Sequence, residues 1–359
     1  MTFSQSYAEA RQKFLDAAKA HGLPVENHVM EGQVGAQGEV LATDTALIGP
    51  ADAENLLIVT SGTHGVEGFC GSGCQGALIG DEDLARRLAP ARAAILLVHA
   101  VNPWGFSHLR RTNEDNIDLN RNCVDFAKPR PINAGYHELD ALLMPKAWPP
   151  APENELSILA YQQQHGMPAF QRAVSAGQYE VADGLFYGGT APAWSQRTMR
   201  AILGRHGAGK KRIGWIDVHT GLGPWGHGEK IFAGRPVPEE LARARAWWGI
   251  DVFATFEPGS VSADVTGPVV GLAQEVCAEA EITGMGLEFG TLPMLEVMQA
   301  LRADQWLHRN PQAPAGQAAA IKRALRDAFY GDTEGWKGMV TSQTRVTVLQ
   351  AVTGLGQKN

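Results

Sequence analysis

The chain has 359 residues, of which 44% are hydrophobic and 19% are charged, and its formal net charge at pH 7 is -7. This length can bury a substantial core, and the composition argues against long disordered regions. The acidic balance gives no electrostatic reason to expect nucleic acid as a partner, because proteins that bind it usually carry a basic face.

The N-terminal segment, residues 1–22, has the pattern of an amphipathic helix and lacks the charged and apolar regions of a secretory signal. No stretch approaches about eighteen uninterrupted apolar residues, so we expect no membrane-spanning helix. The four cysteines form no CxxC pair and indicate no disulfide framework. These features predict a cytoplasmic protein.

Short apolar runs rich in β-branched residues alternate along the chain with helical patterns, such as residues 81–88 and 238–248. This alternation predicts an α/β fold with a largely parallel central sheet and helices on both faces. Active sites of such sheets lie at the carboxyl ends of the strands. The expected strands are residues 55–61, 94–100, 213–218, 251–256 and 285–289.

The segment from about residue 125 to 205 differs in character from the rest of the chain. It is rich in proline and glycine, contains helical patterns and has no convincing central strand. We interpret it as an insertion within a single catalytic domain spanning residues 1–359. Loops of this size are usually functional or disordered, so the insertion could form the wall of a pocket. The alternative is a helical subdomain with a purely structural role.

The first expected strand runs directly into TSGTHGVEG, residues 60–68. His64 and Glu67 are three residues apart, and the small residues around them allow a tight turn that brings both side chains together. An imidazole nitrogen and a carboxylate oxygen both bind Zn²⁺ at about 2.0 to 2.2 Å. On its own this spacing is weak evidence, because it often arises by chance.

The strand at 213–218 leads into DVHTGLGP, residues 217–224. Strand alternation places Asp217 and His219 on the same face, and the glycine-rich exit places His219 at the rim of the sheet. Two histidines and one glutamate leave a fourth tetrahedral position open for water, as catalytic zinc sites do. We therefore expect one Zn²⁺ per chain, bound by His64, Glu67 and His219.

Two further motifs supply candidate catalytic and substrate-binding residues. In DLNRN, residues 118–122, an amide lies beside a guanidinium, and Asn120 with Arg121 can hold a substrate carboxylate. In GLEFGT, residues 286–291, Glu288 lies at an apolar strand end. Burial there would raise its pKa unless a metal or cation offsets the desolvation, which suits a general base near neutral pH.

These motifs, together with NPWGF and RRTN at residues 102–106 and 110–113, resemble those of the zinc carboxypeptidase superfamily, the carboxypeptidase A-like metallopeptidases. The resemblance extends to bacterial carboxypeptidase-like proteins with an HTGLGP signature and spans about residues 56–291. It implies a mixed, mainly parallel sheet of about eight strands in the phosphorylase/hydrolase-like arrangement.

The resemblance also implies roles for individual residues. Arg110 and Arg111 compete for the position that polarises the scissile carbonyl, and the family's RxN spacing favours Arg111. Asp118 matches the position that hydrogen-bonds the first zinc histidine and fixes its tautomer. The implied set is His64, Glu67 and His219 as zinc ligands, Asn120 and Arg121 as the carboxylate anchor, and Glu288 as the general base.

One departure from the superfamily concerns its substrate-binding tyrosine, which usually lies between the last zinc histidine and the catalytic glutamate. No tyrosine occurs between His219 and Glu288. That role would then fall to His227 or to Tyr187, or would be absent.

Two other patterns have structural interpretations. GSGCQG, residues 71–76, formally satisfies GxGxxG but lacks the context of a dinucleotide-binding turn, so we interpret its glycines as close helix packing. Cys70 and Cys74, four residues apart, are expected to be buried small groups. No GxSxG motif occurs, which disfavours a serine hydrolase.

Three functional hypotheses follow. A zinc metallohydrolase that cleaves an amide bond next to a free carboxylate, acting as a metallocarboxypeptidase on peptides, is the first. An N-acyl amino acid amidohydrolase similar to aspartoacylases and desuccinylases is the second, and a non-catalytic metal- or peptide-binding module is the third. The deacylase relatives usually append a β-rich domain. Here residues 293–331 have helical patterns and only residues 345–351 suggest a strand, which favours the peptidase. The side-chain preference and the oligomeric state stay open.

Overall fold

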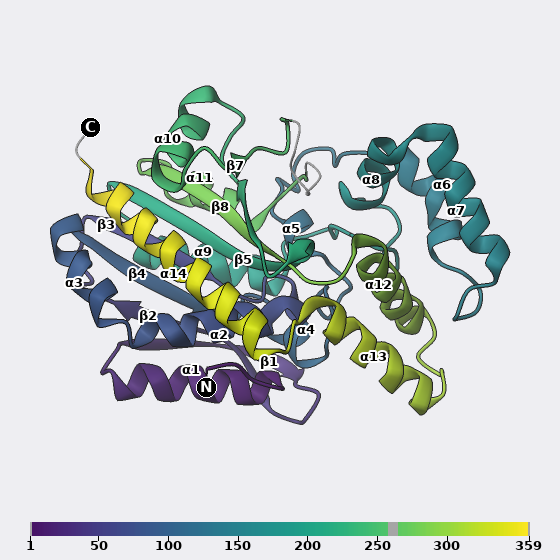
Figure 1. Cartoon of the computed structure of the whole chain (residues 1–359), viewed down its shortest axis with the longest axis horizontal. Coiled ribbons are helices and arrows are strands. Elements are labelled where there is room, and N and C mark those ends of the chain that lie inside the picture. Colours follow the sequence, from purple (N-terminus) through teal and green to yellow (C-terminus); the bar gives the residue numbers. More distant parts are fainter. Residues whose placement is uncertain (1, 258–264, 358–359) are drawn as a thin grey trace.

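The computed structural model of the chain describes residues 2–257 and 265–357 (Figure 1). A single mixed sheet forms its centre. Its strands are β1 (Val25–Val34), β2 (Val40–Ile48), β3 (Asn55–Thr60), β4 (Ala93–His99), β5 (Arg212–Trp225), β6 (Gly228–Phe232), β7 (Val252–Phe253) and β8 (Glu281–Gly290).

The eight strands lie in the order β1-β2-β4-β3-β5-β8-β6-β7. The four in the middle, β4, β3, β5 and β8, are parallel to one another. β2 pairs antiparallel with β4 on one side, and β6 pairs antiparallel with β8 on the other. The expectation of a mixed, mainly parallel sheet of about eight strands is confirmed.

Helices cover both faces of the sheet (Figure 1). Leu57 and Val59 of β3 belong to one core, whereas Leu56 and Ile58 belong to the other, so this strand is buried on both sides. That burial explains its continuous apolar run. The helices packed on the first face are α1 (Tyr7–Ala20), α2 (Gly68–Ile79), α3 (Glu82–Ala91), α10 (Pro238–Trp248) and α14 (Glu334–Gly356), and those on the second are α9 (Trp194–His206) and α11 (Leu272–Val276).

The remaining helices lie toward the carboxyl ends of the central strands. α6, α7 and α8 come from the 125–205 segment and share a third core with α12 and α13, so they pack on these helices, while α9 returns to the sheet. Within this segment the β pairing consists of one isolated bridge, between Gln178 and Tyr187. These helices are α4 (Pro103–Ser107), α5 (Leu119–Asn122), α6 (Ala134–Leu143), α7 (Pro152–His165), α8 (Met167–Ser175), α12 (Met294–Arg309) and α13 (Ala315–Phe329).

Several expected elements were wrong or incomplete. The strand expected at 345–351 is part of helix α14, where Val340, Thr344, Val348 and Ala351 are buried at helical spacing. This packing outweighs the local β preference of the segment. β1 was not expected because it is polar and largely exposed, and β2 and β6 were also not expected. Of the expected strand 251–256, only β7 forms.

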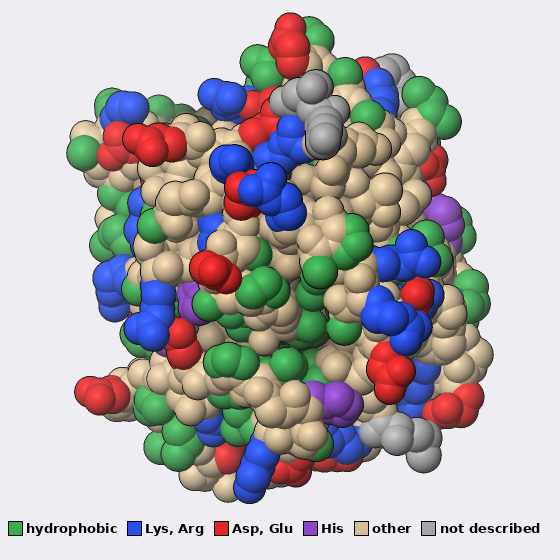
Figure 2. Space-filling model, turned by 90° about the vertical axis from the view of Figure 1, so that its left-hand side faces the viewer, with side chains coloured by type: hydrophobic (Ala, Val, Ile, Leu, Met, Phe, Trp, Pro, Cys, Tyr) green, Lys and Arg blue, Asp and Glu red, His purple; other side chains and the backbone are tan. Residues whose placement is uncertain are grey.

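The surface agrees with the modest net charge. On the face drawn in Figure 2, acidic and basic side chains are interspersed, and no continuous basic stripe covers that face. Among the helices of residues 2–257 and 265–357, none has both the length and the apolar character needed to cross a membrane.

Candidate metal centre

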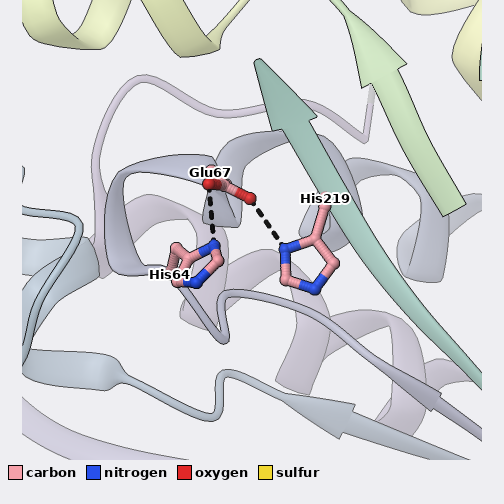
Figure 3. Close-up of side chains that lie close together, drawn as sticks. All are labelled: His64, Glu67 and His219. Carbon is pink, nitrogen blue, oxygen red and sulfur yellow. Dashed lines mark hydrogen bonds and ion pairs between the residues drawn. The ribbon is translucent and has the colours of Figure 1, made fainter. Parts of the chain in front are cut away.

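His64, Glu67 and His219 converge at the carboxyl ends of β3 and β5. His64 Nδ1 lies 2.9 Å from Glu67 Oε1, and His219 Nδ1 lies 2.9 Å from Glu67 Oε2, so the carboxylate lies between the two rings (Figure 3). The three side chains are buried, with relative exposures of 5%, 2% and 7%. Their ligand atoms lie within 4.8 Å of one another.

The turn that carries His64 and Glu67 is held by the neighbouring loop. The backbone N–H groups of Gly65 and Val66 donate to the carbonyls of Arg111 and Arg110, at 3.2 and 2.9 Å. A Cβ at Gly65 would lie 2.0 Å from the carbonyl carbon of Gly105. The turn and the NPWGF motif therefore pack backbone against backbone, which only glycine permits here.

Besides Glu67, which lies next to Nδ1 of both rings, each imidazole has a further carboxylate next to its Nε2. Asp217 Oδ2 lies 2.7 Å from His219 Nε2, and Asp118 Oδ1 lies 3.2 Å from His64 Nε2. A carboxylate can only accept, so the Asp217 contact favours a proton on His219 Nε2 and leaves its Nδ1 as the metal-binding nitrogen. His64 Nε2 faces both Asp118, which can only accept, and Arg111 Nη2 at 2.8 Å, which can only donate, while its Nδ1 faces Glu67. Asp217 is fixed in turn by the hydroxyl groups of Thr60 and Thr63, at 2.7 and 2.8 Å.

The donor set fits Zn²⁺. With the Nε2 proton of His219 given to Asp217, the Nδ1 lone pair of that ring points toward the anionic Glu67, and Nδ1 of His64 faces the same carboxylate. A cation between these three groups would remove the unfavourable contact. Without one, the imidazole must hold a second proton: although burial lowers the pKa of His219, the carboxylates of Asp217 and Glu67 hold it well above its usual range. Two imidazole nitrogens and one carboxylate oxygen, with room for a fourth ligand, are typical of catalytic zinc sites.

Glu288 lies beside this centre on β8, where it is the register partner of His219. Its Oε1 accepts the N–H of Leu222 at 3.1 Å, and it lines the same cavity as the three candidate ligands. Burial, reinforced by the nearby charge of Glu67, raises the pKa of Glu288 to about 8. Within the part of the chain that the structure describes, Glu288 is not part of the metal-binding group.

The two adjacent arginines have different surroundings. Arg111 lines the cavity, donates from Nε to Asp118 Oδ2 at 2.9 Å and from Nη1 to Glu67 Oε1 at 3.2 Å, and places Nη2 2.8 Å from His64 Nε2. Arg110 does not line the cavity and is buried against α12, where its Nε donates to Asp304 at 3.1 Å.

Asp118 connects these groups. Burial alone would raise its pKa, but the guanidinium groups of Arg111 and Arg121, followed by His64, hold it well below the usual range. Asp118 also begins α5, where its Oδ1 accepts the N–H of Asn120 at 2.9 Å. One anionic side chain therefore contacts both arginines and a candidate zinc ligand.

Asn120 and Arg121 both line the cavity, and each is partly engaged by the protein. Asn120 Oδ1 accepts the N–H of Val269 at 2.9 Å, which turns its amide nitrogen toward His219, 3.4 Å away. Arg121 donates from Nε to the carbonyl of Ser175 at 3.1 Å and from Nη1 to that of Asn120 at 3.1 Å. The anchor proposed from sequence therefore has a fixed orientation.

The cavity has a volume of about 550 Å³. Neither His227 nor Tyr187 lines it in this structure: Tyr187 is buried in the second core and His227 is exposed. Phe186 lines the cavity and was missed, because nothing in the sequence around it distinguishes it from a core residue. Apolar residues on two sides complete the lining: Ile231, Phe232, Ala233 and Val270 near β6, and Met294, Val297, Met298, Leu301 and Phe329 from α12 and α13.

The model of the family described as "Protein of unknown function (DUF2817)" matches residues 3–343. No curated protein matches the chain in sequence. Among solved structures, it is similar to thrombin activatable fibrinolysis inhibitor (13% identity, 90% of this chain and 74% of that chain covered, TM-score 0.46). It is also similar to carboxypeptidase A from Helicoverpa armigera (13% identity, 92% of this chain and 75% of that chain covered, TM-score 0.45). A third similar structure is a metallo-carboxypeptidase from Pseudomonas aeruginosa (15% identity, 97% of this chain and 69% of that chain covered, TM-score 0.38). These likenesses are distant, so the residues of this chain carry the functional interpretation.

Proposed function

Because the chain belongs to the DUF2817 family, whose description assigns no reaction, we propose from its site that it is a zinc-dependent hydrolase that cleaves an amide bond next to a free carboxylate. In this proposal its substrates are peptides, cut at the C-terminus. The observation that carries the proposal is the buried group His64, Glu67 and His219, which faces a cavity shared with Glu288 and Arg111.

Bound Zn²⁺ would supply Lewis-acid polarisation and lower the pKa of a coordinated water toward about 7. In this proposal Glu288 accepts a proton from the attacking water and returns it to the departing amine. Burial raises the pKa of Glu288, and Zn²⁺ bound beside it would lower that pKa again toward the range that suits a general base near neutral pH. The carboxylate is held by the N–H of Leu222, which keeps it aimed at the cavity.

The arginines and Asn120 bind and orient the substrate in this proposal. Arg111 lies beside His64 and Glu67 and can donate to the carbonyl oxygen as negative charge develops there. Such a donor is worth about 3 to 4 kcal/mol when well aimed. Asn120 and Arg121 would bind the free carboxylate by charge-assisted hydrogen bonds.

The cavity favours a substrate with apolar groups. Its lining combines apolar residues near β6 and from α12 with the candidate ligands and the two arginines. A peptide with apolar residues on both sides of the scissile bond would contact both groups of apolar residues. A volume of about 550 Å³ also admits a small N-acyl amino acid, so amidohydrolase activity is the second candidate.

The test is hydrolysis of a panel of peptides with free or amidated C-termini and of N-acyl amino acids, with chelator and zinc add-back. We expect cleavage of free-carboxylate substrates that is lost with chelator and restored by zinc. Arg121→Ala should weaken the free-carboxylate substrates far more than their amidated forms, because only the former use the guanidinium. Equal losses of activity on both kinds of substrate would contradict the role of Arg121 as a carboxylate anchor. Absence of hydrolysis by the zinc-loaded protein would favour a non-catalytic binding module.

A further inference from the structure

Phe186 combines a strained backbone with a place in the cavity wall. It lies in the 125–205 segment, its side chain is buried, and its φ is +53°. Glycine adopts this left-handed region freely, whereas a bulky aromatic residue there is an outlier that costs free energy. Such residues persist where the surrounding structure fixes them, and they cluster at functional sites.

Hydrogen bonds fix the backbone around this residue. The carbonyl of Phe186 accepts the N–H of Gln178 at 3.2 Å, and the carbonyl of Tyr187 accepts the N–H of Asp118 at 2.7 Å. The second bond joins the segment to the residue that also contacts His64. The position of the Phe186 ring is therefore tied to the start of α5.

The ring contacts both cavity arginines. The guanidinium carbon of Arg111 lies 5.0 Å from the ring centroid, and that of Arg121 lies 5.5 Å away. Both distances are within the range of cation–π attraction. The same two groups pair with Asp118, at 2.9 Å from Arg111 Nε and 3.7 Å from Arg121 Nη1. One ring and one carboxylate thus hold two like charges near each other.

The segment also closes around Arg121 from another side. A Cβ at Gly177 would lie 2.6 Å from Arg121 Cδ, so the backbone there leaves no room for a side chain. The carbonyl of Ser175 accepts from Arg121 Nε. Arg121 is thereby confined by the backbone at 175–177 and by the aromatic face of Phe186.

We propose that Phe186 is a positioning residue, which orients Arg111 and Arg121 toward the substrate and makes the 125–205 segment part of the recognition site. A residue that only filled the core would be replaceable by any apolar side chain of similar size. A positioning residue requires the aromatic face, because that face attracts the two guanidinium groups. The proposal rests on the proposed function only in taking the ligand of Arg121 to be a carboxylate.

The experiment compares zinc-loaded Phe186→Leu, Phe186→Tyr and Phe170→Leu. Tyrosine keeps the aromatic face, and Phe170 is a buried phenylalanine of the same core that does not line the cavity. We expect Phe186→Leu to raise KM for free-carboxylate peptides and to lower kcat, each by roughly 3- to 30-fold, the range that ordinary cation–π contacts are worth. For amidated peptides, Phe186→Leu should lower kcat and leave KM unchanged. Phe186→Tyr should restore KM and kcat to parent values, and Phe170→Leu should change neither constant.

A second measurement does not depend on turnover. In NMR spectra of the full chain, the Nε–H signals of Arg111 and Arg121 should shift and broaden in Phe186→Leu and stay unchanged in Phe170→Leu. If Phe186→Leu does not fold, Phe186→Met, which fills the space without an aromatic face, takes its place.

The proposal is overturned if Phe186→Leu matches Phe170→Leu in both measurements, or if it weakens free and amidated substrates equally. If the parent protein hydrolyses nothing, the proposed function fails, and the arginine signals alone decide whether Phe186 orients the two side chains.

Discussion

Arg110 and Arg111 are adjacent in the chain, yet they belong to two buried charge networks of different kinds. Arg110 donates to Asp304 at 3.1 Å and to Gln305 at 3.0 Å on α12, and to His308 Nδ1 at 2.7 Å. Arg111 donates to Asp118 and Glu67 beside a cavity of about 550 Å³. The first network joins a loop to α12, whereas Arg111 and Glu67 of the second network line the cavity.

The difference shows that burial and ion pairing do not by themselves identify a site. Asp304 is paired with both Arg110 and Lys322, so its negative charge is compensated within the protein. At the metal centre, Nδ1 of His64 and Nδ1 of His219 both face the Glu67 carboxylate, so the group needs either a bound cation or a second proton on the imidazole. A network that needs an external partner and faces a cavity is a candidate for function, whereas a compensated one stabilises the fold.

The largest expected effect separates chemistry from binding at Glu288. Glu288→Gln keeps the shape of the side chain but cannot accept a proton, so hydrolysis should fall by about 10² to 10⁴ or more. Zinc content and the melting temperature should stay near parent values, because Glu288 is outside the three-residue group. Hydrolysis near the parent rate would place the proton transfer elsewhere, and loss of zinc would make Glu288 a ligand.

Alanine substitution of the two adjacent arginines tests the comparison itself. Arg111→Ala should lower kcat/KM of the folded protein by about 10² to 10³, the cost of losing one well-aimed donor. Arg110→Ala should leave kcat/KM of the folded protein nearly unchanged and lower the free energy of unfolding by about 3 kcal/mol, since a buried ion pair loses one partner. Denaturant unfolding gives the free energy of unfolding of both variants, and steady-state kinetics give their kcat/KM. A large loss of kcat/KM in Arg110→Ala with little loss in Arg111→Ala would show that the two networks were assigned wrongly.

A smaller, pH-dependent effect is expected from the structural network. Burial alone would raise the pKa of Asp304, but Lys322 and Arg110 lower it. The resulting stabilisation is fully present above the pKa of about 3.9 that the carboxyl has in the unfolded chain. It is lost as the pH falls through the lower pKa of Asp304 in the folded protein. The difference in unfolding free energy between the parent and Asp304→Asn should therefore shrink below about pH 4. A difference that stays constant down to pH 3 would refute the assignment.

Much of the fold could be predicted from the sequence because the central strands are buried on both faces. The continuous apolar run that ends at Thr60 reports this directly. Edge strands lack that signal: β1 is largely exposed, and its alternation is hidden among polar residues. The last helix, α14, was misread over residues 345–351 because its β-branched residues pack by helical spacing, which depends on tertiary contacts.

The candidate ligands could be predicted because His64, Glu67 and His219 lie at strand ends, where parallel strands bring them to one edge. The surroundings of the arginines could not be predicted in the same way. Phe186 reaches Arg111 from more than seventy residues later in the sequence, through a segment without regular strand structure. No local pattern reports such a contact, and only the folded chain shows it.

The central claim is that His64, Glu67 and His219 form a zinc site. Elemental analysis of purified protein, before and after dialysis against a weak chelator, tests it most directly. The predicted result is about one equivalent of zinc per chain in the parent, most of it lost in His64→Ala and in His219→Ala, with occupancy kept in Arg110→Ala as a control. A parent protein that binds no zinc when zinc is supplied, or His64→Ala and His219→Ala variants that both keep full occupancy, would contradict the account.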